Sequence, residues 1–362
     1  MIRADDRKGP GSGPRRILIL TVAGLGDFVA GTPALRAIRE RYPQACIWLL
    51  TIPEVGPLAG RCPYVDAVRT LNLRRSRSAL AWVLGPGRRE MWPLIAELRA
   101  MRFDIGVNLY AVGTRAGGLR MAAFLRAIGP RRIVGRSSRG RGIASDASSH
   151  AQVHEVEAQL AVARLLGAMP TEAQPELWVT PEDRAGCLSL LQGHGISAAD
   201  SLACLQVGSA QTEKRWPAER FATVGCRLSA AGARVLLIGS QSERDLCASV
   251  ARAVPRAVSL AGETSLPVLA ALLQHAALLV TNDSGPMHMA AALAVPLVAT
   301  FGPGTPDRFG PRGRGVRLVF AGTQRPDGSA WWDEVGAEVV AEAALRLFRE
   351  ASAKAVPQGE TT

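Results

Sequence analysis

The sequence is poor in the features that mark several classes of protein. Aromatic residues make up 5% of its 362 residues, and none interleaves with the basic residues as in a nucleic-acid stacking motif. The six cysteines form no CxxC pair, which favours reduced thiols in packed positions over a metal site or disulfides. The best apolar runs, residues 17–25 and 293–301, fall well short of the roughly 20 residues that a membrane-spanning helix needs.

Lysine is nearly absent too. Only Lys8, Lys214 and Lys354 occur, and two of them lie in the tails. A single lysine inside the fold of an arginine-rich chain is notable, because its ammonium is a compact, mobile point charge that the planar arginine fork does not replace. The first 15 residues are polar and lack the apolar core of a signal peptide. We therefore expect a disordered leader and a cytoplasmic protein.

The positive charge is concentrated in one segment. The formal net charge is +12, and residues 69–141 contain 16 arginines against three acids, Glu90, Glu97 and Asp104. This segment alone therefore nets +13, and the rest of the chain is close to neutral. A basic field confined to one region indicates an anionic partner that docks there, although a solvated arginine-rich surface would have the same composition. We expect no nucleic-acid partner.

Apolar strands alternate with helices along the whole chain, which predicts an α/β protein with parallel sheets covered on both faces. A proline-rich and acidic stretch around residues 167–180 interrupts this pattern and indicates a linker between two domains. The expected organisation is a leader, an N-terminal domain, a C-terminal domain, a terminal helix and a tail, at residues 1–15, 16–172, 173–336, 337–351 and 352–362. Ligands of such folds bind at the carboxyl ends of the strands and in the cleft between two domains.

The first two polar loops that follow predicted strands each allow two interpretations. In "AGLGDFVAGTP", Asp27 is the only acid; it would either stabilise the turn or act as a general base. We expect Thr32 to cap the helix that follows and Pro33 to be its first residue. In "GSAQTEKRWP", Ser209 and Lys214 precede a helix start, which is typical of a phosphate site but also of an ordinary capped helix with a solvated lysine.

The third and fourth loops are equally ambiguous. In "GSQSERD", Ser242 and Asp245 resemble a capping box, and Glu243 could instead accept hydrogen bonds from a ribose or base. In "TNDSGPMH", Ser284 and Gly285 predict a helix start whose N–H groups would face a diphosphate. His288 would be either a satisfied core histidine or a donor to a phosphate oxygen. The gathering of polar groups at one strand end favours a ligand site.

Four segments together resemble glycosyltransferase family 9, the ADP-heptose:lipopolysaccharide heptosyltransferases. They are "ILILTVAGLGDFVAGTPALRAIRERYPQA", "FDIGVNLY", "KRWPAERFATV" and "TNDSGPMHMAAALAVPLVATFGPGTPDRFGP". The resemblance covers nearly the whole chain. It implies a GT-B fold of two Rossmann-like domains with an interdomain cleft, with the acceptor in the N-terminal domain and the nucleotide sugar in the C-terminal one.

The resemblance also implies roles for individual residues. Asp27 matches the catalytic base of the family, and Lys214 matches the lysine that holds the donor phosphates. The remaining matches to the donor site are Ser209, Asp283, Ser284, Gly285 and His288, with Glu243 as a looser match to an acid that contacts the nucleoside. The arginine-rich stretch has no residue-level match in the family, but its place in the N-terminal domain and its charge suit an anionic acceptor, for which we name Arg74, Arg75, Arg88 and Arg89.

These observations lead to a specific functional hypothesis. The protein would be an inverting, metal-independent glycosyltransferase that moves heptose from ADP-heptose to an anionic glycolipid, the inner core of lipopolysaccharide. It would need no cofactor and no metal, since ADP-heptose is a substrate and no DxD motif occurs. Peripheral contact with the inner face of the cytoplasmic membrane would suit its basic segment. The alternatives are a glycosyltransferase that modifies a small secondary metabolite and a non-enzymatic binder of nucleotides or nucleic acid.

Overall fold

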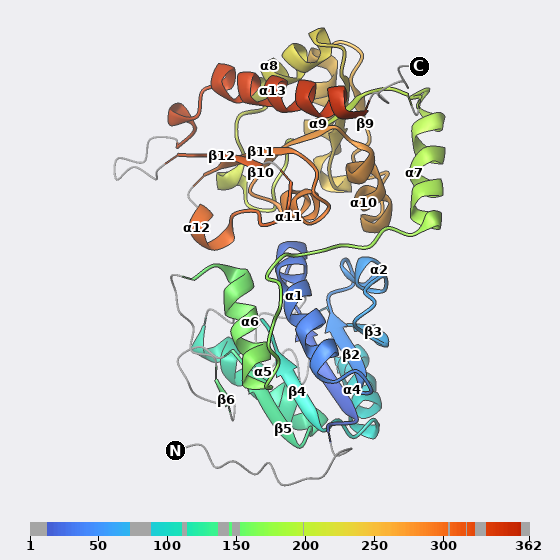
Figure 1. Ribbon diagram of the computed structural model, residues 1–362, viewed down its shortest axis with the longest axis vertical. Coiled ribbons are helices and arrows are strands. Elements are labelled where there is room, and N and C mark those ends of the chain that lie inside the picture. The colour runs from blue at the N-terminus through green and yellow to red at the C-terminus, as the bar shows by residue number, and fades with distance from the viewer. Residues whose placement is uncertain are drawn as a thin grey trace, which may run out of the picture. The chain divides into compact units, whose positions relative to one another are not determined.

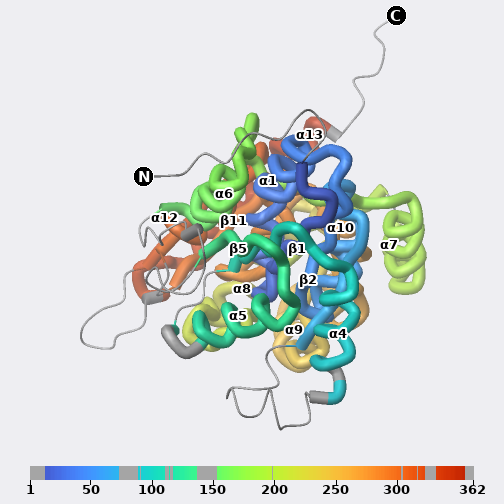
Figure 2. The backbone as a smooth tube through the Cα atoms, turned by 90° about the horizontal axis from the view of Figure 1, so that it is seen from below, coloured from blue at the N-terminus to red at the C-terminus, as the bar shows by residue number. Residues whose placement is uncertain are grey.

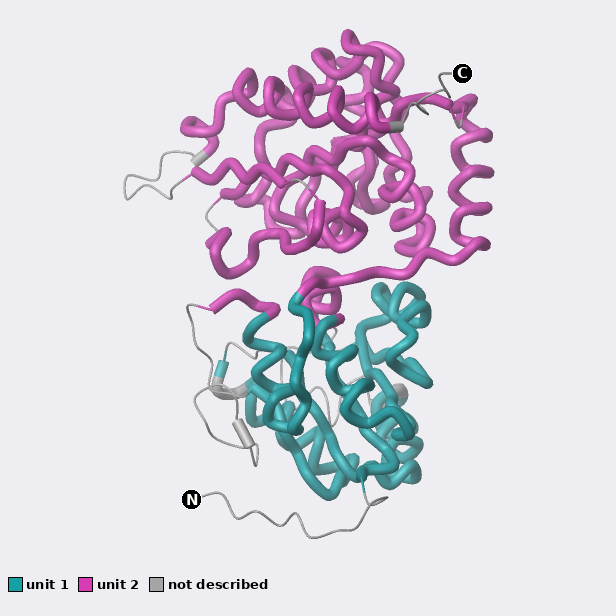
Figure 3. Tube along the Cα trace, viewed as in Figure 1, with its two compact units in different colours: residues 1–23, 33–151, 157–173 teal, residues 24–32, 152–156, 174–362 magenta. Residues whose placement is uncertain are grey.

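The computed structural model describes residues 13–72, 88–110, 114–136, 145–146, 153–197, 199–302, 305–315, 317–322 and 331–355. These residues form two six-stranded sheets in which every strand pair is parallel (Figure 1). The α/β class and the two parallel sheets are therefore confirmed. The chain divides into two compact units (Figure 3). Unit 1 contains Met1–Ala23, Pro33–Ala151 and Glu157–Ala173; unit 2 contains Gly24–Thr32, Gln152–Val156 and Gln174–Thr362.

Unit 1 is built on a sheet of order β3-β2-β1-β4-β5-β6. Its strands are β1 (Arg16–Thr21), β2 (Cys46–Thr51), β3 (Ala67–Thr70), β4 (Ile105–Asn108), β5 (Arg132–Gly135) and β6 (Ser145–Asp146). Its helices are α2 (Gly56–Ala59), α4 (Arg88–Ala100), α5 (Arg115–Ile128) and most of α1 (Leu25–Arg41) and α6 (Glu155–Leu165). Because side chains alternate along a strand, Leu18 and Leu20 of β1 share one face, which α4 and α5 cover.

Unit 2 is built on a sheet of order β12-β11-β10-β7-β8-β9. Its strands are β7 (Leu202–Gln206), β8 (Arg234–Ile238), β9 (Val258–Ser259), β10 (Leu278–Asn282), β11 (Leu297–Phe301) and β12 (Arg317–Ala321). Its helices are α7 (Pro181–Gly193), α8 (Ala218–Ala230), α9 (Arg244–Ala253), α10 (Leu266–His275), α11 (Gly285–Ala292), α12 (Pro306–Phe309) and α13 (Ala337–Ala355). Helices α8, α9 and α13 share one apolar core, and α7 lies against α10 (Figures 1 and 2).

The two sheets have the same topology. Numbered within its own unit, each sheet has the order 3-2-1-4-5-6 of a Rossmann fold. The order reverses between the first and fourth strands, which are β1 and β4 in unit 1 and β7 and β10 in unit 2. A buried asparagine ends the fourth strand in both units, Asn108 and Asn282. Because the two sheets share one strand order, Asn108 and Asn282 occupy equivalent positions. Both lie at the carboxyl edge next to the reversal, where such folds bind ligands.

The start of α1 differs from the expectation. The helix begins at Leu25, so Thr32 and Pro33 lie inside it and Asp27 lies in its first turn. A proline inside a helix leaves the carbonyl four residues earlier without its usual N–H donor, and here that carbonyl belongs to Val29. The Thr32 hydroxyl donates to the Val29 oxygen at 2.8 Å. The helix therefore continues through Pro33, which we wrongly took for its first residue.

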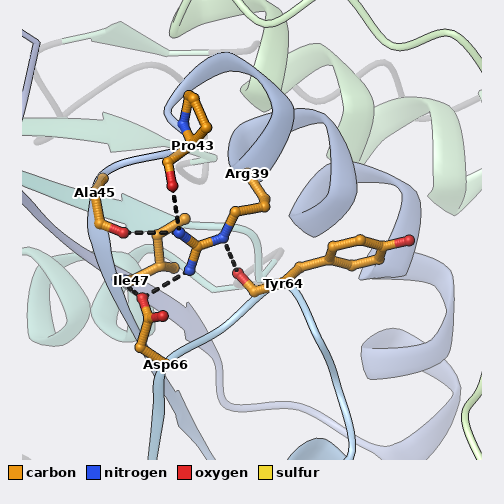
Figure 4. Close-up of polar contacts among 6 residues, drawn as sticks. All are labelled: Arg39, Pro43, Ala45, Ile47, Tyr64 and Asp66. Carbon is orange, nitrogen blue, oxygen red and sulfur yellow. Dashed lines mark hydrogen bonds and ion pairs between the residues drawn. The ribbon is translucent and has the colours of Figure 1, made fainter.

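One arginine ties the end of α1 to the strands beside it. The Arg39 guanidinium donates to three backbone carbonyls and to one carboxylate, and that carboxylate also accepts from a backbone N–H (Figure 4). The carbonyls belong to Pro43, Ala45 and Tyr64, the carboxylate to Asp66 and the N–H to Ile47. Because the planar fork satisfies several acceptors at once, Arg39 fixes the turn between α1 and β2.

Replacing Arg39 with alanine should lower the free energy of unfolding by about 2 kcal/mol, because carbonyls and the Asp66 carboxylate lose a charged donor. Lysine should recover little, since it cannot present the fork. Urea unfolding of the full chain, followed by circular dichroism, measures the change. The control is Arg41→Ala at the exposed end of the same helix, which should change stability by less than about 0.5 kcal/mol. Equal effects of the two substitutions would refute the role of Arg39.

Candidate active site

Two polar loops meet at the carboxyl edge of the sheet in unit 2. Strand β10 pairs in parallel with β7, with Thr281 opposite Gln206, so the loops that follow both strands leave the sheet side by side. They carry Ser209 and Lys214 on one side and Asp283 to His288 on the other. The Lys214 Nζ lies 2.6 Å from the Asp283 Oδ2, and the Ser209 hydroxyl donates to the Asp283 carbonyl at 3.4 Å. The structure thus brings the two loops together.

Lys214 and Asp283 form an ion pair in which the lysine is partly exposed to solvent and the aspartate is buried. The Asp283 side chain is 7% exposed, whereas that of Lys214 is 25% exposed. A buried carboxylate needs a counter-charge, and Lys214 supplies it. An ammonium has three N–H donors, so the contact with Asp283 still leaves two for an anionic ligand at the exposed side. The described contact of the Asp283 carboxylate is with Lys214, and its contact with a donor stays a prediction.

Asn282 connects both loops to the sheet. Its Nδ2 donates to the carbonyls of Val207 and Gly208 at 2.9 and 3.2 Å. Its Oδ1 accepts from the Trp216 N–H at 2.9 Å and from the Thr300 hydroxyl at 3.1 Å. Trp216 comes two residues after Lys214, so this one amide sets the position of the lysine loop. Sequence reasoning quoted Asn282 within its polar cluster but gave it no role; its place at the end of a predicted buried strand was the available signal.

Replacing Asn282 with alanine should weaken ADP binding by roughly 10-fold or more, because the freed loop no longer holds Lys214 in place. Isothermal titration with ADP measures this. Asn108→Ala is the matched control: its Nδ2 donates to the carbonyls of Tyr110 and Arg136 at 3.0 and 2.9 Å in unit 1. That substitution should cost stability but leave ADP affinity unchanged. Equal loss of affinity in both variants would rule out a specific role for Asn282.

Helix α11 begins directly after this ion pair. Ser284 occupies the N-cap position, as expected, but its side chain makes no capping hydrogen bond. Its hydroxyl lies 3.1 Å from the Thr281 hydroxyl instead. The first-turn N–H groups therefore have no cap from Ser284, which leaves the positive end of the helix dipole directed at the site. This arrangement suits an anion.

His288 lies in the first turns of α11 and is electrically neutral at physiological pH. Burial lowers the pKa of its imidazole from 6.5 to about 4; the Asp283 carboxylate opposes the shift, and the nearby His154 and Lys214 favour it. A neutral ring can donate one hydrogen bond but carries no charge. The role of His288 as a donor to a phosphate oxygen stays a prediction, and the positive charge beside Asp283 belongs to Lys214.

The start of α1 packs against the start of α11 within unit 2. A Cβ atom at Gly26 would lie 2.7 Å from the His288 Cδ2 and 3.0 Å from its Nε2. A Cβ at Gly285 would lie 2.7 Å from the Leu25 Cδ2. Both glycines thus permit a close approach that any side chain would prevent. Asp27, which follows Gly26, accepts from the Gly24 N–H at 3.1 Å. It therefore stabilises the helix start, and it lies one residue from the contact with His288.

Glu243 is buried and belongs to a capping box that we had placed two residues too late. Its Oε2 accepts from the Ser240 N–H at 2.7 Å and from the Ser240 hydroxyl at 2.8 Å. The box therefore joins Ser240 to Glu243 and not Ser242 to Asp245. The other oxygen of Glu243 packs tightly over Gly208, at the start of the lysine loop. A contact of Glu243 with a nucleoside stays a prediction.

Of the four arginines named for the acceptor, Arg88 and Arg89 belong to unit 1. Arg74 and Arg75 lie outside the described residues. Arg88 and Arg89 are the first two residues of α4, and Arg89 is exposed. Their contact with an acceptor stays a prediction.

Two kinds of feature are missing from the described part of the chain. Its His, Cys, Asp and Glu side chains form no group of three or more that could hold a metal ion. None of its helices combines the length and the apolar character needed to cross a membrane.

Known proteins resemble this chain in sequence and in fold. The model of glycosyltransferase family 9 (heptosyltransferase) matches residues 91–328. Lipopolysaccharide heptosyltransferase 2 of Salmonella typhimurium is 30% identical over 84% of this chain and 87% of its own length. Among solved structures, a glycosyl transferase family 9 protein of Veillonella parvula has a TM-score of 0.80 at 23% identity, covering 93% of this chain and 97% of that one.

The E. coli ADP-heptose lps heptosyltransferase II is a further structural neighbour, with a TM-score of 0.74 at 23% identity over 92% of this chain and 99% of that one. These likenesses confirm the predicted GT-B fold. The family match extends over well more than half of the chain, from within α4 to beyond β12. Together with the sequence relatives, it shows that this chain is a glycosyltransferase and belongs to glycosyltransferase family 9, the heptosyltransferase family.

Proposed function

We propose that this protein transfers heptose from ADP-heptose to an anionic glycolipid acceptor, the inner core of lipopolysaccharide, with inversion and without a metal ion. The observation that supports it most is the ion pair of Lys214 and Asp283 at the start of α11, with Asp27 held nearby through the contact of Gly26 and His288. Asp27 offers a carboxylate base, and Lys214 with the start of α11 offers a set of anion-binding groups. The names of the relatives supply the sugar and the acceptor class.

The reaction divides between these groups. The Asp27 carboxylate takes the proton of the acceptor hydroxyl as its oxygen attacks the anomeric carbon from the face opposite the diphosphate. The bond from that carbon to the diphosphate oxygen breaks, and ADP leaves with the electron pair. The Lys214 ammonium, the N–H groups of α11 and the neutral His288 ring stabilise the charge that develops on the diphosphate. Attack from the opposite face inverts the anomeric configuration.

The acceptor is inferred from charge and from the names of the relatives. An acceptor from lipopolysaccharide suits the basic segment of residues 69–141 and the names of the relatives. A small secondary metabolite as acceptor is the remaining alternative, whereas membership of an enzyme family disfavours a non-enzymatic binder. We include in the proposal a cytoplasmic location with contact at the inner face of the membrane.

A product assay tests the proposal. The enzyme is incubated with ADP-heptose and either heptose-deficient lipopolysaccharide core or a set of aminocyclitols, with and without EDTA. Release of ADP and a heptosylated core of inverted anomeric configuration, unaffected by EDTA, is the expected result. A product formed only with the small acceptors would refute the acceptor, retention would refute the mechanism, and loss of activity with EDTA would refute metal independence.

A further inference from the structure

A buried histidine outside the four polar loops lies beside the candidate site. His154 is 9% exposed. It lies far from those loops in sequence, yet its segment, Gln152–Val156, belongs to unit 2. Its ring is close enough to His288 to influence that residue electrostatically. Neither the reaction proposed above nor the sequence motifs give it a role.

Both ring nitrogens of His154 are used by the backbone. The Val156 N–H donates to the Nδ1 at 3.2 Å, so the Nδ1 carries no proton. In a neutral imidazole the proton must then be on the Nε2, which lies 2.9 Å from the Gly310 carbonyl. His154 therefore donates to Gly310. Since a buried carbonyl needs a donor, this bond helps to hold Gly310 in place, together with the bond from its N–H to the Pro306 carbonyl.

Gly310 begins a segment that packs against the C-terminal end of helix α11. We call residues 310–315 the strap. A Cβ at Gly313 would overlap the Ala291 carbonyl, and a Cβ at Gly315 would lie 2.7 Å from the Ala294 carbonyl oxygen. The strap therefore contacts the backbone at the C-terminal end of α11. The same helix carries Gly285 and His288 nearer its start, so α11 links the strap to the candidate anion-binding groups.

We propose that His154 is a positioning residue: through its bond to Gly310 it holds the strap against α11 and so fixes the helix whose first turns face the donor diphosphate. It touches no reacting atom. Its effect reaches the reaction through the place of α11 relative to the ion pair of Lys214 and Asp283. The role in transfer rests on the proposed function, whereas the mechanical role does not.

Side chains that can and cannot reach the Gly310 carbonyl separate this role from general destabilisation. The amide nitrogen of glutamine lies near the position of the histidine Nε2, whereas that of asparagine lies near the Nδ1. His154→Gln should therefore keep the bond to Gly310, and His154→Asn and His154→Ala should lose it. His194→Ala is the control, because His194 pairs with Glu263 at the surface.

The experiment measures hydrogen exchange of two amides at the end of α12, ADP affinity and transfer in the full-length protein. The reporters are the N–H groups of Phe309 and Gly310, which donate to Thr305 and Pro306. In His154→Ala and His154→Asn we expect faster exchange there, an ADP Kd raised about 10-fold and kcat/KM lowered about 10-fold, the size of effect for one buried hydrogen bond. His154→Gln and His194→Ala should stay within about twofold of the parent.

Unchanged exchange and affinity in His154→Ala would overturn the proposal, and so would an equal defect in His154→Gln. If His154→Ala does not fold, the comparison of the glutamine and asparagine variants decides, since only their reach differs. If the parent protein does not transfer heptose, the proposed function fails, but exchange and ADP affinity still judge the role of His154. The two failures are therefore distinguishable.

Discussion

Replacing Asp27 with asparagine should reduce the rate of heptose transfer by roughly 10²–10⁴-fold, because the amide cannot take a proton from the acceptor hydroxyl. The fold should survive, since the asparagine oxygen can still accept from the Gly24 N–H as the Asp27 Oδ2 does at 3.1 Å. ADP affinity should change by less than about twofold, because the anion-binding groups stay in place. Steady-state kinetics with ADP-heptose and titration with ADP measure the two effects.

Asp183 provides a matched control for this substitution. It lies in the first turn of α7, and its Oδ2 accepts from the Thr180 N–H at 3.1 Å, so it performs the same structural task on another helix. Asp183→Asn should leave kcat unchanged. Asp27→Ala, which also loses the contact with Gly24, should add about 1 kcal/mol of destabilisation to the loss of rate. Normal turnover in Asp27→Asn would show that another group is the base.

Replacing Lys214 with alanine should weaken binding of ADP by about 10²-fold, because a charged hydrogen-bond donor to the diphosphate is lost. The loss has a second cause. Asp283, which is 7% exposed and 2.6 Å from the Lys214 Nζ, would face the diphosphate as an unpaired carboxylate and repel it. Titration with ADP measures the effect, and Lys354→Ala at the exposed end of α13 is a control with unchanged affinity expected.

A double-mutant cycle separates these two causes. Asp283→Asn removes the repelling charge, so the variant with both Lys214→Ala and Asp283→Asn should bind ADP more tightly than Lys214→Ala alone. If ADP binds the double variant as weakly as the single one, repulsion by Asp283 contributes nothing. Parent-like affinity in Lys214→Ala would remove this residue from the phosphate site altogether.

Short-range patterns predicted most elements but misjudged where some of them begin. The apolar stretches before the four polar loops are strands β1, β7, β8 and β10, as predicted, since a strand covered on both faces must be apolar throughout. The start of α1 was misplaced because a threonine before a proline is typical of a helix start. Here the Thr32 hydroxyl satisfies the Val29 carbonyl, so the same pair lies within the helix. Capping depends on which side chain reaches the backbone, and spacing alone does not determine that.

The resemblance to a family identified the residues of the candidate site but not how they act on one another. Sequence alone provided the parallel sheets, the polar loops after the strands and the isolated Lys214, because each depends on composition or on local periodicity. Only the folded chain shows Lys214 paired with Asp283, Asn282 joined to Trp216 and His154 joined to Gly310. These contacts join residues 66 to 156 positions apart. The neutral state of His288 also depends on burial, and burial is a property of packing that no local pattern records.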